Sequence, residues 1–288
     1  MSKSSSPERS QLSLYRKYRP ERFEDVRGQE QVVSVLESAV KNGKIAHAYL
    51  FAGGRGTGKT SMARILARAL ETADVDVYEM DAASNRGIDE IRELREGVST
   101  LPFNSTYKFY IIDEAHALTK DAWGAFLKTL EEPPEHAIFV LATTELDRVP
   151  ETIVSRCQVF NFKKPTHEVL KKLVLDVSKK EGASIDPSGA ELVALMGEGS
   201  FRDTLGILQK VLTISSDEKL SEAEVARVVG APSSASVNAV KINNGTPTLK
   251  LPLARRYTTT GVSAIRSAVI WFGVTNAGIN GSTTARST

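Results

Sequence analysis

The chain has 288 residues, of which 41% are hydrophobic and 25% charged, and its formal net charge is +2. This length allows a sizeable core in two or more domains, and the lack of a long apolar run or an apolar leader predicts a cytoplasmic protein without membrane contact. The single cysteine, Cys157, excludes an intramolecular disulfide and any all-cysteine metal site.

Charge is distributed unevenly along the chain. Residues 241–288 contain six basic and no acidic residues, which leaves 31 basic against 35 acidic residues, a net charge of −4, in the first 240. Because this larger part is not globally basic, any contact with nucleic acid requires a local basic face.

Residues 1–13 are polar and serine-rich at their start, and we expect them to be disordered. Strands and helices then alternate, which predicts an α/β domain over residues 14–164 with a parallel sheet covered by helices on both faces. The patterns predict helices at 25–40, 61–70, 89–98 and 122–130, and strands at 48–52, 75–80, 108–114, 137–143 and 158–162.

A glycine-rich segment between the first strand and the second helix reads G-x-x-x-x-G-K-T, the pattern of a phosphate-binding loop. It consists of Gly53, Gly54, Arg55, Gly56, Thr57, Gly58, Lys59 and Thr60. Glycines let the backbone approach phosphates, and a helix N-terminus favours anions. Lys59 is expected to reach the β- and γ-phosphates of a nucleoside triphosphate, and the Thr60 hydroxyl to ligate Mg²⁺.

The strand at 108–114 ends in two carboxylates, Asp113 and Glu114. Parallel α/β sheets bind ligands at the carboxyl ends of their strands, so Asp113 is expected to help hold Mg²⁺ and Glu114 to polarise the attacking water. The alternative is a pair of plain helix-capping residues. His116 is interpreted as a structural or supporting group, because a lone histidine is usually no ligand.

From residue 165 the pattern changes to helices alone, which predicts a small helical domain over 165–232 with a hinge near Pro165. Residues 233–288 form an atypical tail. After Val240 this tail is rich in Thr, Asn, Gly and Ser and shows no sustained helical or strand period.

With these parts in place, the chain resembles the clamp-loader group of AAA+ P-loop ATPases, and within it the gamma/tau subunits of bacterial DNA polymerase III. The resemblance covers nearly all of residues 14–230. It rests on the segments at 14–20, 28–30, 47–51, 81–84, 127–136, 141–144, 155–157 and 199–203, in addition to the phosphate loop.

The resemblance implies an AAA+ core followed by a helical lid domain, and it implies further site residues. Thr144 matches a sensor of the γ-phosphate or water, Arg156 an arginine finger that enters a neighbouring subunit's site, and Arg202 a γ-phosphate sensor within the same chain. An arginine so placed stabilises the charge of phosphoryl transfer. Tyr18, Arg19, Pro20 and Val26 match the segment that lines the adenine pocket.

Two departures from the family pattern matter. Relatives carry a four-cysteine zinc module after the phosphate-loop helix, whereas residues 69–75 cross this gap without cysteine, so no zinc is expected. Relatives also continue into a helical collar domain that holds a ring together. The tail resembles none of it, and an out-of-frame or truncated gene would explain the difference.

The leading hypothesis is an ATPase that uses ATP and Mg²⁺ as a motor subunit of the DNA polymerase III clamp loader, without a polymerase active site of its own. Implied partners are other clamp-loader subunits, a sliding clamp and primer-template DNA, which is held through its phosphates and not by sequence. Alternatives are a non-hydrolysing or assembly-defective scaffold subunit of the same complex, or another AAA+ DNA-remodelling ATPase.

Overall fold

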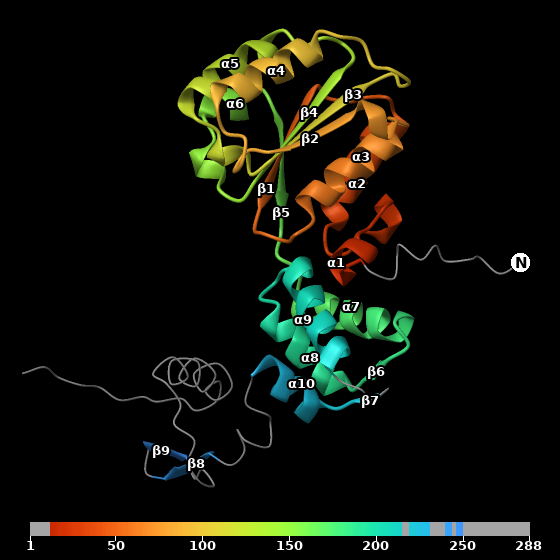
Figure 1. Ribbon diagram of the computed structural model, residues 1–288, viewed down its shortest axis with the longest axis vertical. Coiled ribbons are helices and arrows are strands. Elements are labelled where there is room, and N and C mark those ends of the chain that lie inside the picture. The colour runs from red at the N-terminus through yellow and green to blue at the C-terminus, as the bar shows by residue number, and fades with distance from the viewer. Residues whose placement is uncertain (1–11, 215–218, 231–239, 244–245, 250–288) are drawn as a thin grey trace, which may run out of the picture. The chain divides into compact units, whose positions relative to one another are not determined.

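A computed structural model describes residues 12–214, 219–230, 240–243 and 246–249 of the chain (Figure 1). Contacts divide the chain into one compact unit of residues Met1–Ser233 and a second of residues Ser234–Thr288. The predicted disorder of residues 1–13 and the predicted tail at 233–288 fall mostly outside the described residues. Among the described helices, none combines the length and apolar character needed to cross a membrane.

The first unit contains a five-stranded sheet in which every neighbouring pair of strands is parallel. The spatial order is β2-β3-β4-β1-β5. The strands are β1 (Ala48–Gly53), β2 (Val77–Asp81), β3 (Lys108–Asp113), β4 (Ala137–Thr143) and β5 (Gln158–Phe162). The predicted parallel α/β architecture is therefore confirmed.

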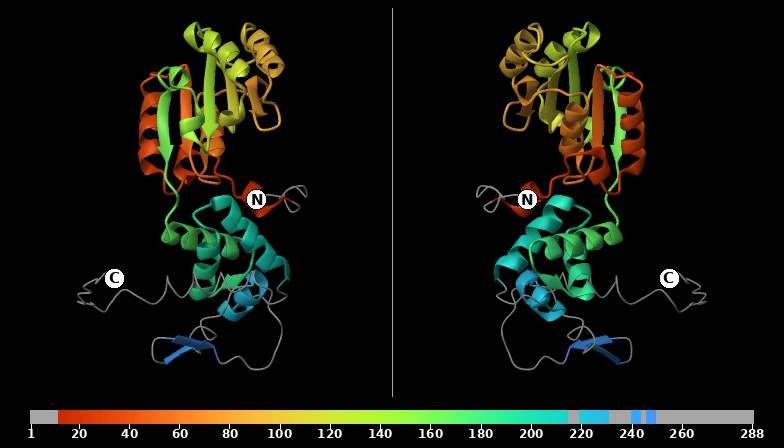
Figure 2. Two further views of the ribbon diagram at one scale, coloured as in Figure 1. Left: turned by 90° about the vertical axis from the view of Figure 1, so that its left-hand side faces the viewer. Right: turned by 90° about the vertical axis from the view of Figure 1, so that its right-hand side faces the viewer.

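Helices lie on both sides of this sheet (Figures 1 and 2). They are α2 (Glu30–Lys41), α3 (Lys59–Ala69), α4 (Ile88–Val98), α5 (Lys120–Glu131) and α6 (Glu151–Val154), whereas α1 (Leu14–Lys17) lies away from the sheet faces. Short 3₁₀ turns occur at Phe23–Asp25, Asp74–Asp76, Ala115–Ala117 and Leu146–Arg148. Successive side chains of a strand point to opposite faces, so each buried strand contributes to two separate cores.

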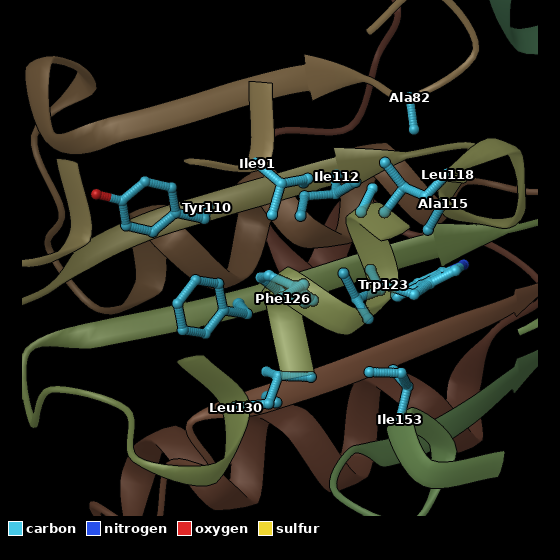
Figure 3. Packing of buried hydrophobic residues seen from close by; sticks show 14 of the residues in the cluster. Ala82, Ile91, Tyr110, Ile112, Ala115, Leu118, Trp123, Phe126, Leu130 and Ile153 are labelled. Carbon is cyan, nitrogen blue, oxygen red and sulfur yellow. The ribbon is translucent and has the colours of Figure 1, made fainter. Parts of the chain in front are cut away.

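Strand β3 shows this division clearly. Phe109 and Ile111 join the core that α2 and α3 cover, whereas Tyr110 and Ile112 join the core under α4, α5 and α6. Figure 3 shows the second core, where Phe126 packs edge-on against Phe139 with ring centres 5.3 Å apart. Burying side chains of this size stabilises the fold by roughly 1.5–3 kcal/mol each. The two cores fix the strand ends from which the candidate site residues project.

The rest of the first unit is helical, with α7 (His167–Lys180), α8 (Pro187–Met196), α9 (Phe201–Ile214) and α10 (Glu222–Val229). Two short strands, β6 (Ser184–Ile185) and β7 (Lys219–Leu220), pair in parallel between them. A third core joins these helices, and Leu14 of α1 is buried in it. The N-terminal segment thus packs against the helical part, although in sequence it precedes the sheet.

Several boundaries differ from the predicted ones. The helix predicted from residue 25 begins at Glu30, because Asp25 ends a 3₁₀ turn and Gly28 has a positive φ of +68°. The strand predicted from residue 75 begins at Val77, since residues 74–76 form a 3₁₀ turn instead.

The described part of the second unit forms an antiparallel hairpin of β8 (Val240–Asn243) and β9 (Thr246–Leu249), where the sequence predicted no regular period. The residues between these strands in the sequence, Asn244 and Gly245, are a pair typical of two-residue hairpin turns.

Candidate nucleotide-binding site

The phosphate loop joins the end of β1 at Gly53 to the start of α3 at Lys59. Gly56 and Gly58 have positive φ angles of +70° and +105°, which favour glycine. A Cβ at Gly56 would lie 2.0 Å from Ser200 Oγ, whereas a Cβ at Gly58 would meet nothing within 4 Å. Gly56 is therefore required where the start of α9 approaches the loop, whereas at Gly58 the backbone conformation alone favours glycine.

Lys59 is 5% exposed, and its Nζ donates to the carbonyl oxygens of Gly53 at 2.7 Å and Gly54 at 2.9 Å. Burial lowers the pKa of Lys59, and the nearby carboxylates of Glu114 and Asp113 partly oppose this shift. The ammonium is held by carbonyl dipoles of the loop and lines the cavity, so it is available to an anionic ligand there.

The two expected magnesium ligands lie together. Thr60 Oγ1 donates to Asp113 Oδ2 at 2.7 Å, and Asp113 Oδ1 accepts the Glu114 N–H at 3.0 Å. In an octahedral Mg²⁺ site, neighbouring oxygens about 2.1 Å from the metal are about 3 Å apart. A hydroxyl and a carboxylate at this separation fit adjacent positions of such a site.

Glu114 adopts a left-handed backbone with φ +49°, which is uncommon for a residue other than glycine. Its Oε2 accepts a hydrogen bond from Thr144 Oγ1 at 3.1 Å and lies 3.5 Å from His116 Nδ1. His116 also lies 3.1 Å from Thr143 Oγ1 and 3.2 Å from the Glu145 carboxylate. Thr144 and His116 therefore surround one oxygen of the carboxylate. Backbone strain of this kind often occurs at functional sites.

A cavity of about 500 Å³ opens beside the loop. It is lined by residues of three parts of the unit: the N-terminal segment, the loop with the ends of the sheet, and helices α7 and α9. Of the predicted site residues, those on its wall are Tyr18, Arg19, Pro20, Val26, Arg55, Gly56, Thr57, Gly58, Lys59, Thr60, Asp113, Glu114 and Arg202. The segment expected to hold adenine and the loop expected to hold phosphates thus share one cavity.

Arg202 reaches this cavity from the helical part. The N–H of Phe201, beside it, donates to the Gly56 carbonyl at 3.0 Å, and the Arg202 guanidinium lies 5.8 Å from the centre of the Tyr15 ring. The start of α9 is thereby attached directly to the phosphate loop.

Arg156 lies elsewhere and is not among the residues that line this cavity. Its Nη2 forms an ion pair with Glu131 Oε1 at 2.8 Å, and its Nη1 donates to the Thr152 carbonyl at 2.7 Å. The side chain is 35% exposed. Arg156 therefore does not contact its own site in this structure, which leaves its expected role in a neighbouring subunit as a prediction.

Many residues that line the cavity were given no role from the sequence, among them Tyr15, Phe201 and the buried Gln29. Gln29 also contacts the Thr57 carbonyl of the loop. The segment Gly28-Gln29-Glu30 contributed to the resemblance, but a glutamine next to a predicted helix carries no signal of its own. Their positions depend on contacts between segments far apart in the chain.

The chain matches one family model and several known proteins. The family model described as "DNA polymerase III, delta subunit" matches residues 28–79 and 70–166. The chain is 45% identical over 229 residues to DNA polymerase III subunit tau of Bacillus subtilis, which covers 72% of the chain and 41% of that protein. It is 39% identical over 238 residues to the tau subunit of Escherichia coli, covering 75% of the chain and 37% of that protein.

Among solved structures, the Holliday junction branch migration motor RuvB of Thermotoga maritima superposes with a TM-score of 0.63 at 22% identity, over 78% of this chain and 74% of that one. This likeness shows the AAA+ fold. The chain spans less than half the length of both tau subunits. Through its sheet and helical part, the chain belongs to the family of bacterial DNA polymerase III gamma/tau subunits.

Proposed function

We propose that this chain binds and hydrolyses ATP as a motor subunit of a clamp loader, which places a sliding clamp on primer-template DNA. The observation that carries the proposal is the convergence of Lys59, Thr60, Asp113 and Glu114 on one cavity. The names of the relatives support a place in the DNA polymerase III assembly. No polymerase chemistry is proposed for the chain itself.

The binding step follows from the loop. Backbone N–H groups at the start of α3 and the Lys59 ammonium attract the phosphates of ATP. Thr60 and Asp113 would hold Mg²⁺, which neutralises charge on the β- and γ-phosphates when it is bound. The adenine is expected beside Tyr18, Arg19, Pro20 and Val26, which line the same cavity.

The hydrolytic step is assigned to Glu114, whose carboxylate would orient and polarise the attacking water. Its contact with Thr144 fixes one carboxylate oxygen and leaves the other for water. Arg202 would sense the γ-phosphate within the chain, and Arg156 would complete the site of a neighbouring subunit. ATP binding would thereby require only one chain, whereas fast hydrolysis would require an assembly of subunits.

A clamp-loading role requires contact with a clamp, DNA and other subunits. DNA contact is expected through phosphates and therefore without sequence preference. A scaffold subunit with a decayed site remains the alternative, but the intact pairing of Thr60 with Asp113 argues against decay.

Substitution of Lys59 tests the proposal. Lys59→Ala should abolish binding of a fluorescent ATP analogue, because a buried cation beside the phosphates is removed. Lys44→Ala, an exposed lysine outside the cavity, is the matched control and should bind as the wild type does. Micromolar affinity retained by Lys59→Ala would refute the site. With nucleotide binding established, ATP-dependent loading of the clamp by the complete assembly tests the wider role.

A further inference from the structure

Gln29 immediately precedes α2, is only 4% exposed, and contacts two segments that are distant in the sequence. Its Nε2 donates to the Lys163 carbonyl at 2.7 Å and, through a longer contact of 3.4 Å, to the Thr57 carbonyl in the phosphate loop. Its Oε1 accepts the Lys163 N–H at 3.2 Å. One side chain therefore joins the loop to the segment that follows β5 and leads into α7.

We propose that Gln29 is a positioning residue that couples the phosphate loop to the hinge at Lys163, and so couples nucleotide binding to the path of the chain into the helical part. This inference rests on the proposed function, because it assumes that the loop holds the phosphates of ATP. Gln29 lines the cavity, but its hydrogen bonds all go to backbone groups of the chain, so the proposal assigns it no contact with the phosphates or the reacting atoms.

The chemistry of an amide suits this position. A neutral primary amide offers two N–H donors and a carbonyl acceptor. Gln29 uses both functions, because its Nε2 donates to the carbonyls of Thr57 and Lys163 and its Oε1 accepts the Lys163 N–H. A carboxylate of the same shape lacks the donors, and a thioether lacks both functions. With a carboxylate, the Lys163 carbonyl would lose its donor in a part-buried position, and with a thioether both backbone groups of Lys163 would lose their partner. An unsatisfied polar group away from water costs more than the bond itself contributes.

The contact with the loop has a defined consequence. In a trans peptide the carbonyl and the following N–H point in opposite directions. When Gln29 holds the Thr57 carbonyl, the N–H of Gly58 points away from Gln29. Gly58 lines the cavity, so in this orientation its N–H can face a phosphate bound there. Gln29 thus orients a phosphate-binding group through the peptide plane.

The contact with the hinge extends to the helical part. Lys164 follows Lys163, and its side chain lies beside two glycines. A Cβ added at Gly54 would lie 3.6 Å from Lys164 Cε, and a Cβ added at Gly199 would lie 3.2 Å from Lys164 Cβ. The loop is also bonded to α9 through Gly56 and Phe201. A shift of the loop on nucleotide binding would therefore be felt at the hinge and at the start of α9.

The test compares Gln29→Glu and Gln29→Met in the full chain with Gln31→Glu, which makes the same charge change on an exposed position of α2. The first readout is affinity for ADP and for a slowly hydrolysed ATP analogue. The second is trypsin cleavage after Lys163 with and without nucleotide. Trypsin does not cut before proline, so cleavage in Lys163-Lys164-Pro165 reports on Lys163.

Both Gln29 variants should bind nucleotide about tenfold more weakly. Cleavage after Lys163 should rise about tenfold relative to cleavage at other sites, and nucleotide should no longer protect it as it protects the wild type. Gln31→Glu should match the wild type in both measurements. A merely structural role would instead lower the unfolding midpoint and raise cleavage at all sites together, which would overturn the proposal.

Wild-type affinity and unchanged hinge protection in the Gln29 variants would also overturn it. If Gln29→Glu does not fold, Gln29→Met, which adds no charge, decides the question. Lys59→Ala distinguishes failure of the role proposed for Gln29 from failure of the proposed function. If it abolishes binding while the Gln29 variants behave as the wild type, only the role of Gln29 is wrong. If Lys59→Ala itself binds normally, the proposed function fails.

Discussion

Gly56→Ala tests the contact between the phosphate loop and α9. Gly56 has φ +70°, and the added Cβ would lie 2.0 Å from Ser200 Oγ, so the serine must rotate. Ser200 directly precedes α9 and accepts the Asp203 N–H at 3.2 Å, a helix-capping bond that the rotation removes. The substitution therefore combines backbone strain with the loss of a cap.

The magnitude follows from these two costs. A left-handed backbone costs a residue other than glycine about 1–2 kcal/mol, and loss of an N-cap bond costs about 1 kcal/mol. Gly56→Ala should therefore lower the free energy of unfolding by about 2–3 kcal/mol in urea titrations. Nucleotide affinity should also fall, about tenfold, because the loop is displaced from α9.

Gly43→Ala is the matched control, because Gly43 has a similar φ of +62° and a Cβ there would meet nothing within 4 Å. It should show the backbone cost alone and normal nucleotide binding. Ser200→Ala removes the clashing oxygen, so its cost and that of Gly56→Ala should be less than additive by about 1 kcal/mol. We would reject this explanation if Gly56→Ala and Gly43→Ala lowered the free energy of unfolding equally and if the effects of Gly56→Ala and Ser200→Ala were additive.

Three further predictions concern the rest of the first unit. Arg156→Ala should leave ATP binding intact and reduce hydrolysis only in assembled mixtures; an equal loss in the isolated chain would contradict a role between subunits. Burial raises the pKa of Cys157 to about 12, so its neutral thiol stabilises the fold fully below the unfolded pKa of about 8.5, and this contribution is lost as the pH rises toward 12. Alkylation of Cys157 at pH 8 should thus be much faster in urea than in buffer, and equal rates would contradict its burial. Elemental analysis of the purified protein should find no stoichiometric zinc, and one zinc per chain would show that another ligand set replaces the cysteines.

Much of the sheet could be predicted, because its strands are short apolar runs bounded by turn residues. The bounds of β4 and β5 match the predicted ones. The start of β2 could not be predicted, since it depends on a distant contact: Asp76 is buried and accepts the N–H groups of Phe103 and Asn104. Those hydrogen bonds outweigh the effect of burial and lower the pKa of Asp76. A contact of this kind between segments leaves no periodic pattern in the sequence.

The candidate site also has features that could be predicted from the sequence and features that could not. The phosphate loop and the carboxylates of Asp113 and Glu114 follow from local motifs and from the rule that parallel strands present their carboxyl ends together. The attachment of α9 to Gly56 and of Gln29 to Lys163 depends on how distant segments fold onto each other. Sequence patterns therefore predicted the chemical groups, and the structure supplies the connections between them.

The most direct test of the central claim is a crystal structure of the chain with Mg²⁺ and a non-hydrolysable ATP analogue. We expect the β- and γ-phosphates to lie within hydrogen-bonding distance of Lys59 and the N–H groups of the loop, with the metal beside Thr60 and Asp113 and a water beside Glu114. A nucleotide bound elsewhere, or a metal away from Thr60 and Asp113, would contradict this claim.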